Sequence, residues 1–112
     1  MKMDITEQDG VLRVGLVGRL DTPGVDAIET RLTAACVPGA ARAIVDLSGV
    51  EFIGSLGLRM FITIARALTR RSGRMVLYAP QGFVAQVFET ASLGDIIPVR
   101  PDAAAALVAV RS

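Results

Sequence analysis

The sequence predicts an α/β fold, a mixed β-sheet of about five strands with about four helices packed on it. Short apolar runs typical of strands alternate with segments whose apolar residues recur every three to four positions, as in helices. The expected order is β-β-α-β-α-β-α-β-α, and its later β-α-β crossovers require parallel strands and right-handed connections. Because 112 residues suffice for one hydrophobic core, we expect a single domain spanning residues 1–112.

The chain is expected to begin with two strands in a hairpin-like arrangement, followed by a helix. Residues 3–7 have weak strand character, and residues 11–17 form a second strand after a glycine-containing turn. The first helix is predicted to start at Thr22 as its N-cap, with Pro23 in the first helical position. It should end near Cys36, just before a Val-Pro-Gly sequence.

The centre of the chain predicts a strand, a short turn and a second helix. Residues 43–47 are almost continuously apolar, as expected of a central strand covered on both faces. After a short turn, the helix opens on Ser55 and runs to about Arg71. Gly73 then suits the end of a helix.

The last part of the chain predicts two more strands and two more helices. Residues 75–79 form a strand, residues 83–91 a helix, and residues 102–110 a final alanine-rich helix. Residues 96–99 are a short edge strand, because a proline fits an edge better than a centre. The helix at 83–91 is expected to place four apolar side chains on one side: Phe83, Val84, Val87 and Phe88.

Composition excludes several classes of function. The net charge of +1 gives no electrostatic footprint for nucleic acid. There is no histidine, which removes the commonest general base and zinc ligand, so we expect no enzyme, metal site or cofactor. The only cysteine, Cys36, reads as a small buried apolar residue. No signal peptide and no apolar run of roughly 18 residues is found, so we expect a cytoplasmic protein without direct membrane insertion.

The second helix carries apolar side chains on two faces. At about 100° per residue, one face expected to pack on the sheet is formed by Leu58, Phe61, Ile62, Ala65 and Leu68.

Leu56, Met60 and Ile64 fall nearly opposite that face, and Arg59 lies on a polar flank. Two explanations remain open for these three apolar residues. Neighbouring helices cover them, or they form a docking or homodimer surface that begins beside Ser55.

Four motifs in this order and spacing resemble a STAS domain, the family of bacterial anti-sigma factor antagonists and of the cytoplasmic part of sulfate transporters. The motifs are residues 18–21, residues 45–50 followed by Phe52-Ile53, the pair Gly57-Leu58, and residues 92–97. The resemblance covers essentially the whole chain and implies the fold more specifically than the function.

The resemblance implies a non-enzymatic antagonist that binds an anti-sigma factor of the serine/threonine kinase type. Phosphoregulated members carry an acidic residue, a second residue and then the phosphoacceptor directly before a glycine. Here Gly54 occupies the acidic position and Leu56 the acceptor position, so the chain lacks both groups at this helix start. Ser55 is either a displaced acceptor or a helix N-cap. With the apolar residues of the second helix added, the expected partner-binding residues are Asp21, Gly54, Ser55, Leu56, Gly57, Arg59, Met60 and Ile64.

We expect Leu56, together with Met60 and Ile64, to make an apolar contact that phosphorylation at position 56 cannot switch off. This also suits an alternative, an accessory STAS subunit of an ABC-type lipid transport complex that docks constitutively. A small enzyme or nucleotide-binding module is disfavoured, because the chain lacks a phosphate-cradling loop. We favour the antagonist, because a free-standing single-domain STAS chain most often resembles that class.

Overall fold

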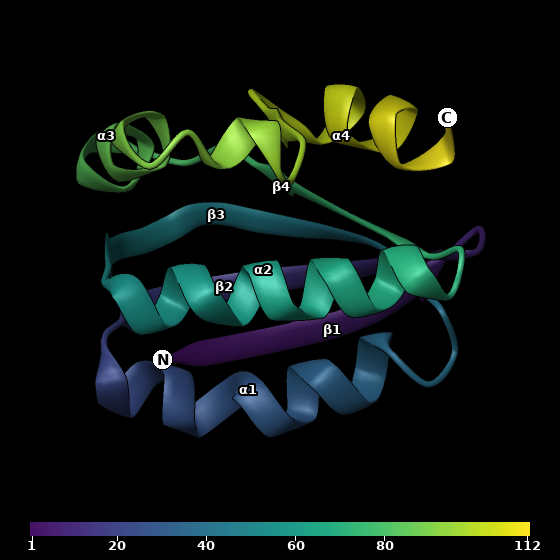
Figure 1. Cartoon of the computed structure of the whole chain (residues 1–112), viewed down its shortest axis with the longest axis horizontal. Coiled ribbons are helices and arrows are strands. Elements are labelled where there is room, and N and C mark those ends of the chain that lie inside the picture. The colour runs from purple at the N-terminus through teal and green to yellow at the C-terminus, as the bar shows by residue number, and fades with distance from the viewer.

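In the computed structural model, which describes residues 1–112, five strands form one mixed sheet in the order β1-β2-β3-β4-β5 (Figure 1). The predicted fold class and order of elements are confirmed, with one short 3₁₀ helix in addition. The elements are β1 (Lys2–Gln8), β2 (Val11–Leu20), α1 (Thr22–Cys36), β3 (Arg42–Ile53), α2 (Ser55–Arg70), β4 (Arg74–Tyr78), α3 (Gly82–Thr90), the 3₁₀ helix (Leu93–Asp95), β5 (Val99–Arg100) and α4 (Ala103–Arg111).

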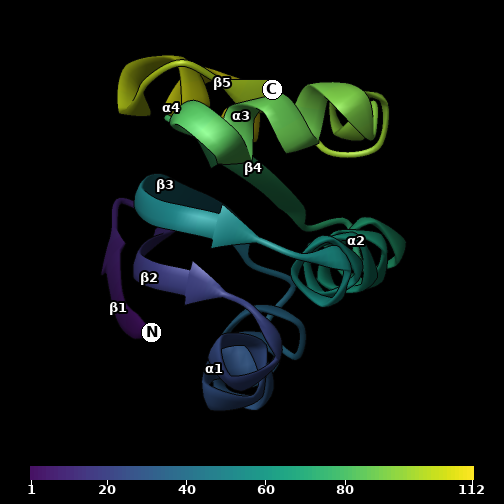
Figure 2. The ribbon, with the colours of Figure 1, turned by 90° about the vertical axis from the view of Figure 1, so that its left-hand side faces the viewer.

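The strand directions bring three helix starts to one edge of the sheet. β1 pairs antiparallel with β2, and the pairs β2–β3, β3–β4 and β4–β5 are parallel. The carboxyl ends of β2, β3 and β4 therefore lie at the same edge, where α1, α2 and α3 begin. Figure 2 shows α1 and α2 together on one side of the sheet, with α3 and α4 near β4 and β5.

The core is aliphatic and has two parts. The larger cluster joins the sheet to α1 and α2 through side chains such as Ile28 and Phe61. The smaller cluster lies on the other face, where Val11, Ile44 and Val76 pack against α4. No helix is long and apolar enough to cross a membrane.

β3 is longer than predicted, because the chain does not turn at Ser48 and Gly49. The strand runs on to Ile53 with shifts in its register against β2. Gly49 marks a close approach of the two strands: a Cβ there would lie 2.8 Å from Val17 Cγ2 and 2.9 Å from the carbonyl oxygen of Leu16. The glycine thus permits tight strand packing rather than a turn.

The edge strand lies later than predicted and covers only Val99–Arg100. The amides of Ile96 and Ile97 both donate to the carbonyl oxygen of Leu93, closing a helical turn instead of a β-ladder. Ile97 is buried in the larger core cluster. The position of this strand at an edge of the sheet is confirmed.

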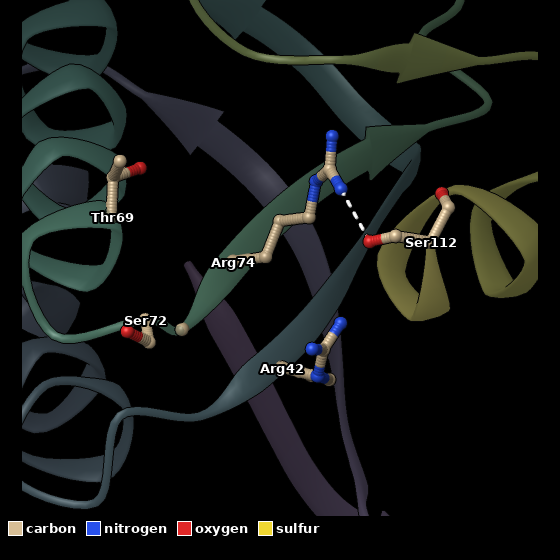
Figure 3. A pocket seen from close by; sticks show the side chains of 6 residues that line it. Arg42, Thr69, Ser72, Arg74 and Ser112 are labelled. Atoms are coloured by element: carbon tan, nitrogen blue, oxygen red, sulfur yellow. Dashed lines mark hydrogen bonds between the residues drawn. The ribbon is translucent and has the colours of Figure 1, made fainter.

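Arg42 and Arg74 line a polar hollow of about 290 Å³ at the opposite end of the sheet from the helix starts (Figure 3). The Arg42 guanidinium donates to the carbonyl oxygen of Val110, and that of Arg74 donates to the carbonyl oxygen of Ser112 at 2.8 Å. The last carbonyl groups of a helix have no partner within it, and arginine stabilises them by hydrogen bonding and by charge. These two arginines therefore hold the end of α4.

Candidate functional site

The candidate site is the start of α2, where the carboxyl ends of β2 and β3 meet. The Gly54 amide donates to the carbonyl oxygen of Leu20 at 3.0 Å, which ties the two strand ends together. The carbonyl oxygen of Gly54 accepts from the Gly57 and Leu58 amides. Gly54 is thus the N-cap of α2, in extended conformation and without a side-chain cap. The alternative that Ser55 is the N-cap is wrong, since Ser55 is the first helical residue and is exposed.

Gly57 lets the first turn of α2 lie directly on the strand ends. A Cβ at this position would lie 2.7 Å from Ile53 Cγ1 and 3.1 Å from Leu20 Cβ. Because Ile53 and Leu20 are themselves fully packed in the core, neither can give way easily. Gly57 is buried beneath the candidate site, so its role is to position the helix rather than to touch a partner.

The buried face of α2 differs from the predicted one. Met60 is 0% exposed and Ile64 is 2% exposed, so of the two explanations left open for them, cover by a neighbouring helix is confirmed and a docking or homodimer surface is wrong. Both belong to the larger core cluster, together with Ile28 and Leu32 of α1. At about 100° per residue, the buried arc is rotated by about 65° from the predicted one. The buried residues are Gly57, Met60, Phe61, Ile64, Ala65 and Leu68.

Leu56 is the one large apolar side chain of α2 that remains exposed, at 38%. Ser55 precedes it and Arg59 follows it on the exposed side of the helix. Of the three residues for which a docking surface was one explanation, Leu56 alone is exposed. The predicted surface, however, is reduced to this first turn, because Met60 and Ile64 are inaccessible.

Arg19, Phe52 and Phe83 form a stack at the same edge of the sheet. The rings of Phe52 and Phe83 are 5.5 Å apart between centroids and inclined by 5°. The guanidinium carbon of Arg19 lies 4.4 Å from the Phe52 centroid, within range of a cation–π interaction. A Cβ on Gly54 would lie 3.6 Å from the Phe52 ring, so the stack adjoins the helix start.

The sequence predicted Phe83 on the same side of α3 as Val84 and Phe88, but the structure separates them: Phe83 is 48% exposed. Val84 and Phe88, about one turn apart, are buried. Phe83 lies about 100° from Val84 around the helix axis, so helix geometry alone places Phe83 at the flank of the buried face. Contact with Phe52, from a distant segment, gave no sequence signal.

Asp21 caps α1 and anchors Arg19. Its Oδ1 accepts from the Gly24 amide at 2.9 Å, and its Oδ2 lies 3.5 Å from Arg19 Nε. The hydrogen bond from Gly24 lowers the pKa of the Asp21 carboxyl below its usual value, and Arg19 lowers it further. The N-cap is thus Asp21 and not Thr22, which is the first helical residue; an ionised carboxylate suits the positive end of a helix.

No three side chains of the types that ligate metals lie together in the structure. Asp46 pairs with Gly15 of β2 and Tyr78 of β4 in the sheet, and its carboxylate accepts from the Ser48 amide at 2.9 Å, which is a structural role. The exposed features of the site are therefore an apolar side chain, a hydroxyl, an aromatic ring and arginines. This combination suits contact with another protein, since aromatic residues and arginine are enriched where binding energy concentrates.

Comparison with known proteins agrees with this fold. The STAS domain family matches residues 2–106. BtrV of Bordetella bronchiseptica, whose name assigns it provisionally to the anti-sigma factor antagonists, is 30% identical over 112 residues, which is 100% of this chain and 97% of BtrV. An anti-sigma F factor antagonist of Lysinibacillus sphaericus is 31% identical over 91 residues, which is 80% of this chain and 76% of that protein.

Among solved structures, the crystal structure of an anti-sigma factor antagonist from Mycobacterium paratuberculosis has a TM-score of 0.86 and 27% sequence identity. The similarity covers 99% of this chain and 94% of that one. A mixed sheet with helix starts gathered at one edge is thus shared with a class of small regulatory domains. The chain belongs to the STAS domain family.

Proposed function

We propose that this protein is a non-enzymatic anti-sigma factor antagonist that binds an anti-sigma factor of the serine/threonine kinase type. The observation that carries the proposal is the exposed Leu56 at the start of α2, in a STAS chain similar over its full length to a protein named for this activity. The surface consists of Ser55, Leu56 and the exposed side of Arg59. Such an antagonist acts in the cytoplasm, where sigma factors act.

Binding at this surface is set by an apolar contact rather than by phosphate at the acceptor position of the family. Leu56 has no hydroxyl, and burying a leucine completely stabilises a contact by about 1.5–3 kcal/mol. Leu56 is already partly covered within the protein, so the partner can bury only the exposed part of the side chain. Binding therefore gains less than half of this free energy. Ser55 supplies the hydroxyl at the helix start, and its phosphorylation would add a charge of about −1.5 to −2 beside Leu56.

The test is affinity capture from the native cell lysate, followed by binding measurements with the purified partner. Wild type is compared with Leu56→Glu and with Val108→Glu, a matched control at an exposed apolar residue of α4. We expect wild type and Val108→Glu to recover a kinase-like anti-sigma factor that Leu56→Glu loses. Phosphosites are mapped on the same sample, where phosphate on Ser55 would show a displaced switch.

Other outcomes contradict the proposal. Recovery of membrane transport subunits in place of an anti-sigma factor would assign the chain to a transport complex. Recovery of neither class would restrict the similarity to the fold. If Leu56→Glu binds the anti-sigma factor as tightly as wild type, the contact lies elsewhere on the protein.

A further inference from the structure

The solvent-facing side of α2 carries three arginines in a row. Arg59, Arg66 and Arg70 lie on one ridge with Thr63 between them, and all four residues are exposed. At about 1.5 Å per residue, this arginine ridge extends for roughly 16 Å from the turn that follows Leu56. The one ion pair of the structure joins Arg19 to Asp21, so no carboxylate of the chain pairs with the ridge.

The ridge is part of a marked separation of charge along the chain. The chain as a whole has 12 basic and 11 acidic residues. Yet no Asp or Glu occurs between Glu51 and Glu89, a stretch that includes all of α2. Exposed helix faces gain stability when opposite charges stand three or four residues apart, and α2 has no such pair.

Helix stability accounts for only one of the three arginines. Arg70 lies in the last turn, where a cation interacts favourably with the helix dipole. Arg59 lies toward the positive end of the helix, and Arg66 lies far from either end. No ion pair within the chain uses the positive charge at these two positions, which leaves it available to a partner.

We propose that the arginine ridge is the electrostatic part of the docking surface and contacts an acidic face of the anti-sigma factor. This inference rests on the proposed function and names the chemistry of its partner. The ridge continues from Leu56 along the same exposed side of α2, so one partner surface covers both. Leu56 then provides the local apolar contact, while the arginines accelerate association and fix the orientation of the partner.

The surroundings of the ridge favour a protein partner over a nucleic acid or a membrane. α1 lies beside α2 on the same side of the sheet and exposes two carboxylates, Asp26 and Glu29, against one arginine, Arg31 (Figure 1). A phosphate backbone or an anionic bilayer laid across this face would meet these carboxylates as well as the arginines. A folded protein can instead present carboxylates opposite α2 alone, which is the pattern that complements this face.

The test titrates the purified anti-sigma factor against the full chain between about 50 and 300 mM NaCl. The variants are Arg66→Gln, Arg66→Glu and the control Arg111→Glu, which reverses an exposed charge at the end of α4. We expect Arg66→Glu to raise Kd by about tenfold at low salt, chiefly through slower association, and by less at high salt. Arg66→Gln should flatten the salt dependence, and Arg111→Glu should change Kd by less than about twofold.

Three results would overturn the inference, and they are distinguishable. If Arg66→Glu and Arg111→Glu behave alike while Leu56→Glu abolishes binding, the ridge is not part of the surface but the proposed function stands. If wild type binds no anti-sigma factor, both proposals fail.

Vesicles of phosphatidylglycerol and phosphatidylcholine, and a duplex DNA, are titrated in parallel. Binding to either that depends on Arg66 and exceeds binding to the anti-sigma factor would also contradict an acidic protein partner.

Discussion

Leu56 and Met60 lie one turn apart on α2, yet Leu56 is 38% exposed and Met60 is fully buried. Gly57 lets the start of α2 pack closely on the sheet. Within this one turn, the chain therefore passes from an exposed side chain to a buried one. A partner can therefore reach Leu56 while the protein keeps its structure, but it cannot reach Met60.

The first prediction separates these two residues. Leu56→Glu should change the free energy of unfolding by no more than about 0.5 kcal/mol, because Leu56 lies at the surface. The same substitution should weaken binding of the anti-sigma factor at least about tenfold, because it places a charge in an apolar contact. Met60→Ala should lower the free energy of unfolding by about 2–5 kcal/mol by leaving a cavity.

Urea denaturation and binding titration of the two variants check this prediction. Met60→Ala should bind normally under conditions where it is folded, which makes it the control for a purely structural loss. A large loss of stability in Leu56→Glu would contradict the exposed position of Leu56. A loss of binding by folded Met60→Ala would contradict the purely structural role of Met60.

Gly57→Ala should destabilise the protein and displace the candidate site. The added methyl group would lie 2.7 Å from Ile53 Cγ1, so the helix start must move away from the sheet. Forcing a methyl group into a packed core typically costs about 1–3 kcal/mol. Gly15→Ala is the matched control, because its Cβ would meet nothing within 4 Å. Equal free energies of unfolding for the two variants would show that α2 does not depend on this close approach.

The sequence predicted the elements well but not the orientation of α2. Helical periodicity shows which side chains share a face, but not which face meets the sheet. That direction depends on the contact of Gly57 with Ile53 and Leu20, which belong to two other elements. The exposure of Leu56 was predictable because the first turn of a helix extends beyond its neighbours.

The aromatic stack shows a second limit of sequence reasoning. Phe52 and Phe83 belong to β3 and α3, and their rings meet only because these elements are neighbours in the folded sheet. The local pattern grouped Phe83 with the other apolar residues on one side of α3 and gave no sign of a contact with β3. The lone Cys36, in contrast, is buried as predicted, because its place at the end of an amphipathic helix already fixed its face.

The lowered pKa of Asp21 predicts that the protein loses stability in acid. Its folded-state pKa lies below the usual value of 3.8, so the unfolded state binds more protons between the two pKa values. The stabilising contribution is thus complete above the unfolded pKa and is lost as the pH falls through the folded pKa. Asp21→Asn should be less stable than wild type at pH 7, and the difference should shrink below about pH 4. Urea denaturation from pH 2 to 7 checks this, and a difference independent of pH would contradict the role of the charge.

The raised pKa of the Cys36 thiol predicts that the protein loses stability in alkali. Burial raises the pKa of its thiol from 9.0 to about 11. The unfolded state therefore releases a proton at lower pH than the folded state, and the free energy of unfolding falls as the pH rises between these values. Cys36→Ala should lose less stability than wild type between pH 8 and about pH 10.5. The native thiol should also react slowly with a thiol reagent and rapidly in urea, and fast reaction of the folded protein would contradict its burial.

Ser55 offers a test of the switch that Leu56 cannot provide. The Ser55 side chain is exposed and does not cap the helix, so Ser55→Ala should leave both stability and binding almost unchanged. Ser55→Glu places a negative charge in the first turn of α2, where it should stabilise the helix by about 0.3–1 kcal/mol. A partner that covers Leu56 must also remove water from this charge, which costs free energy. The charge also partly cancels that of the nearby Arg59, so binding of an acidic partner should weaken. Stability and affinity should therefore change in opposite senses, with higher stability and weaker binding. If Ser55→Glu binds as tightly as Ser55→Ala, phosphorylation at Ser55 does not regulate docking.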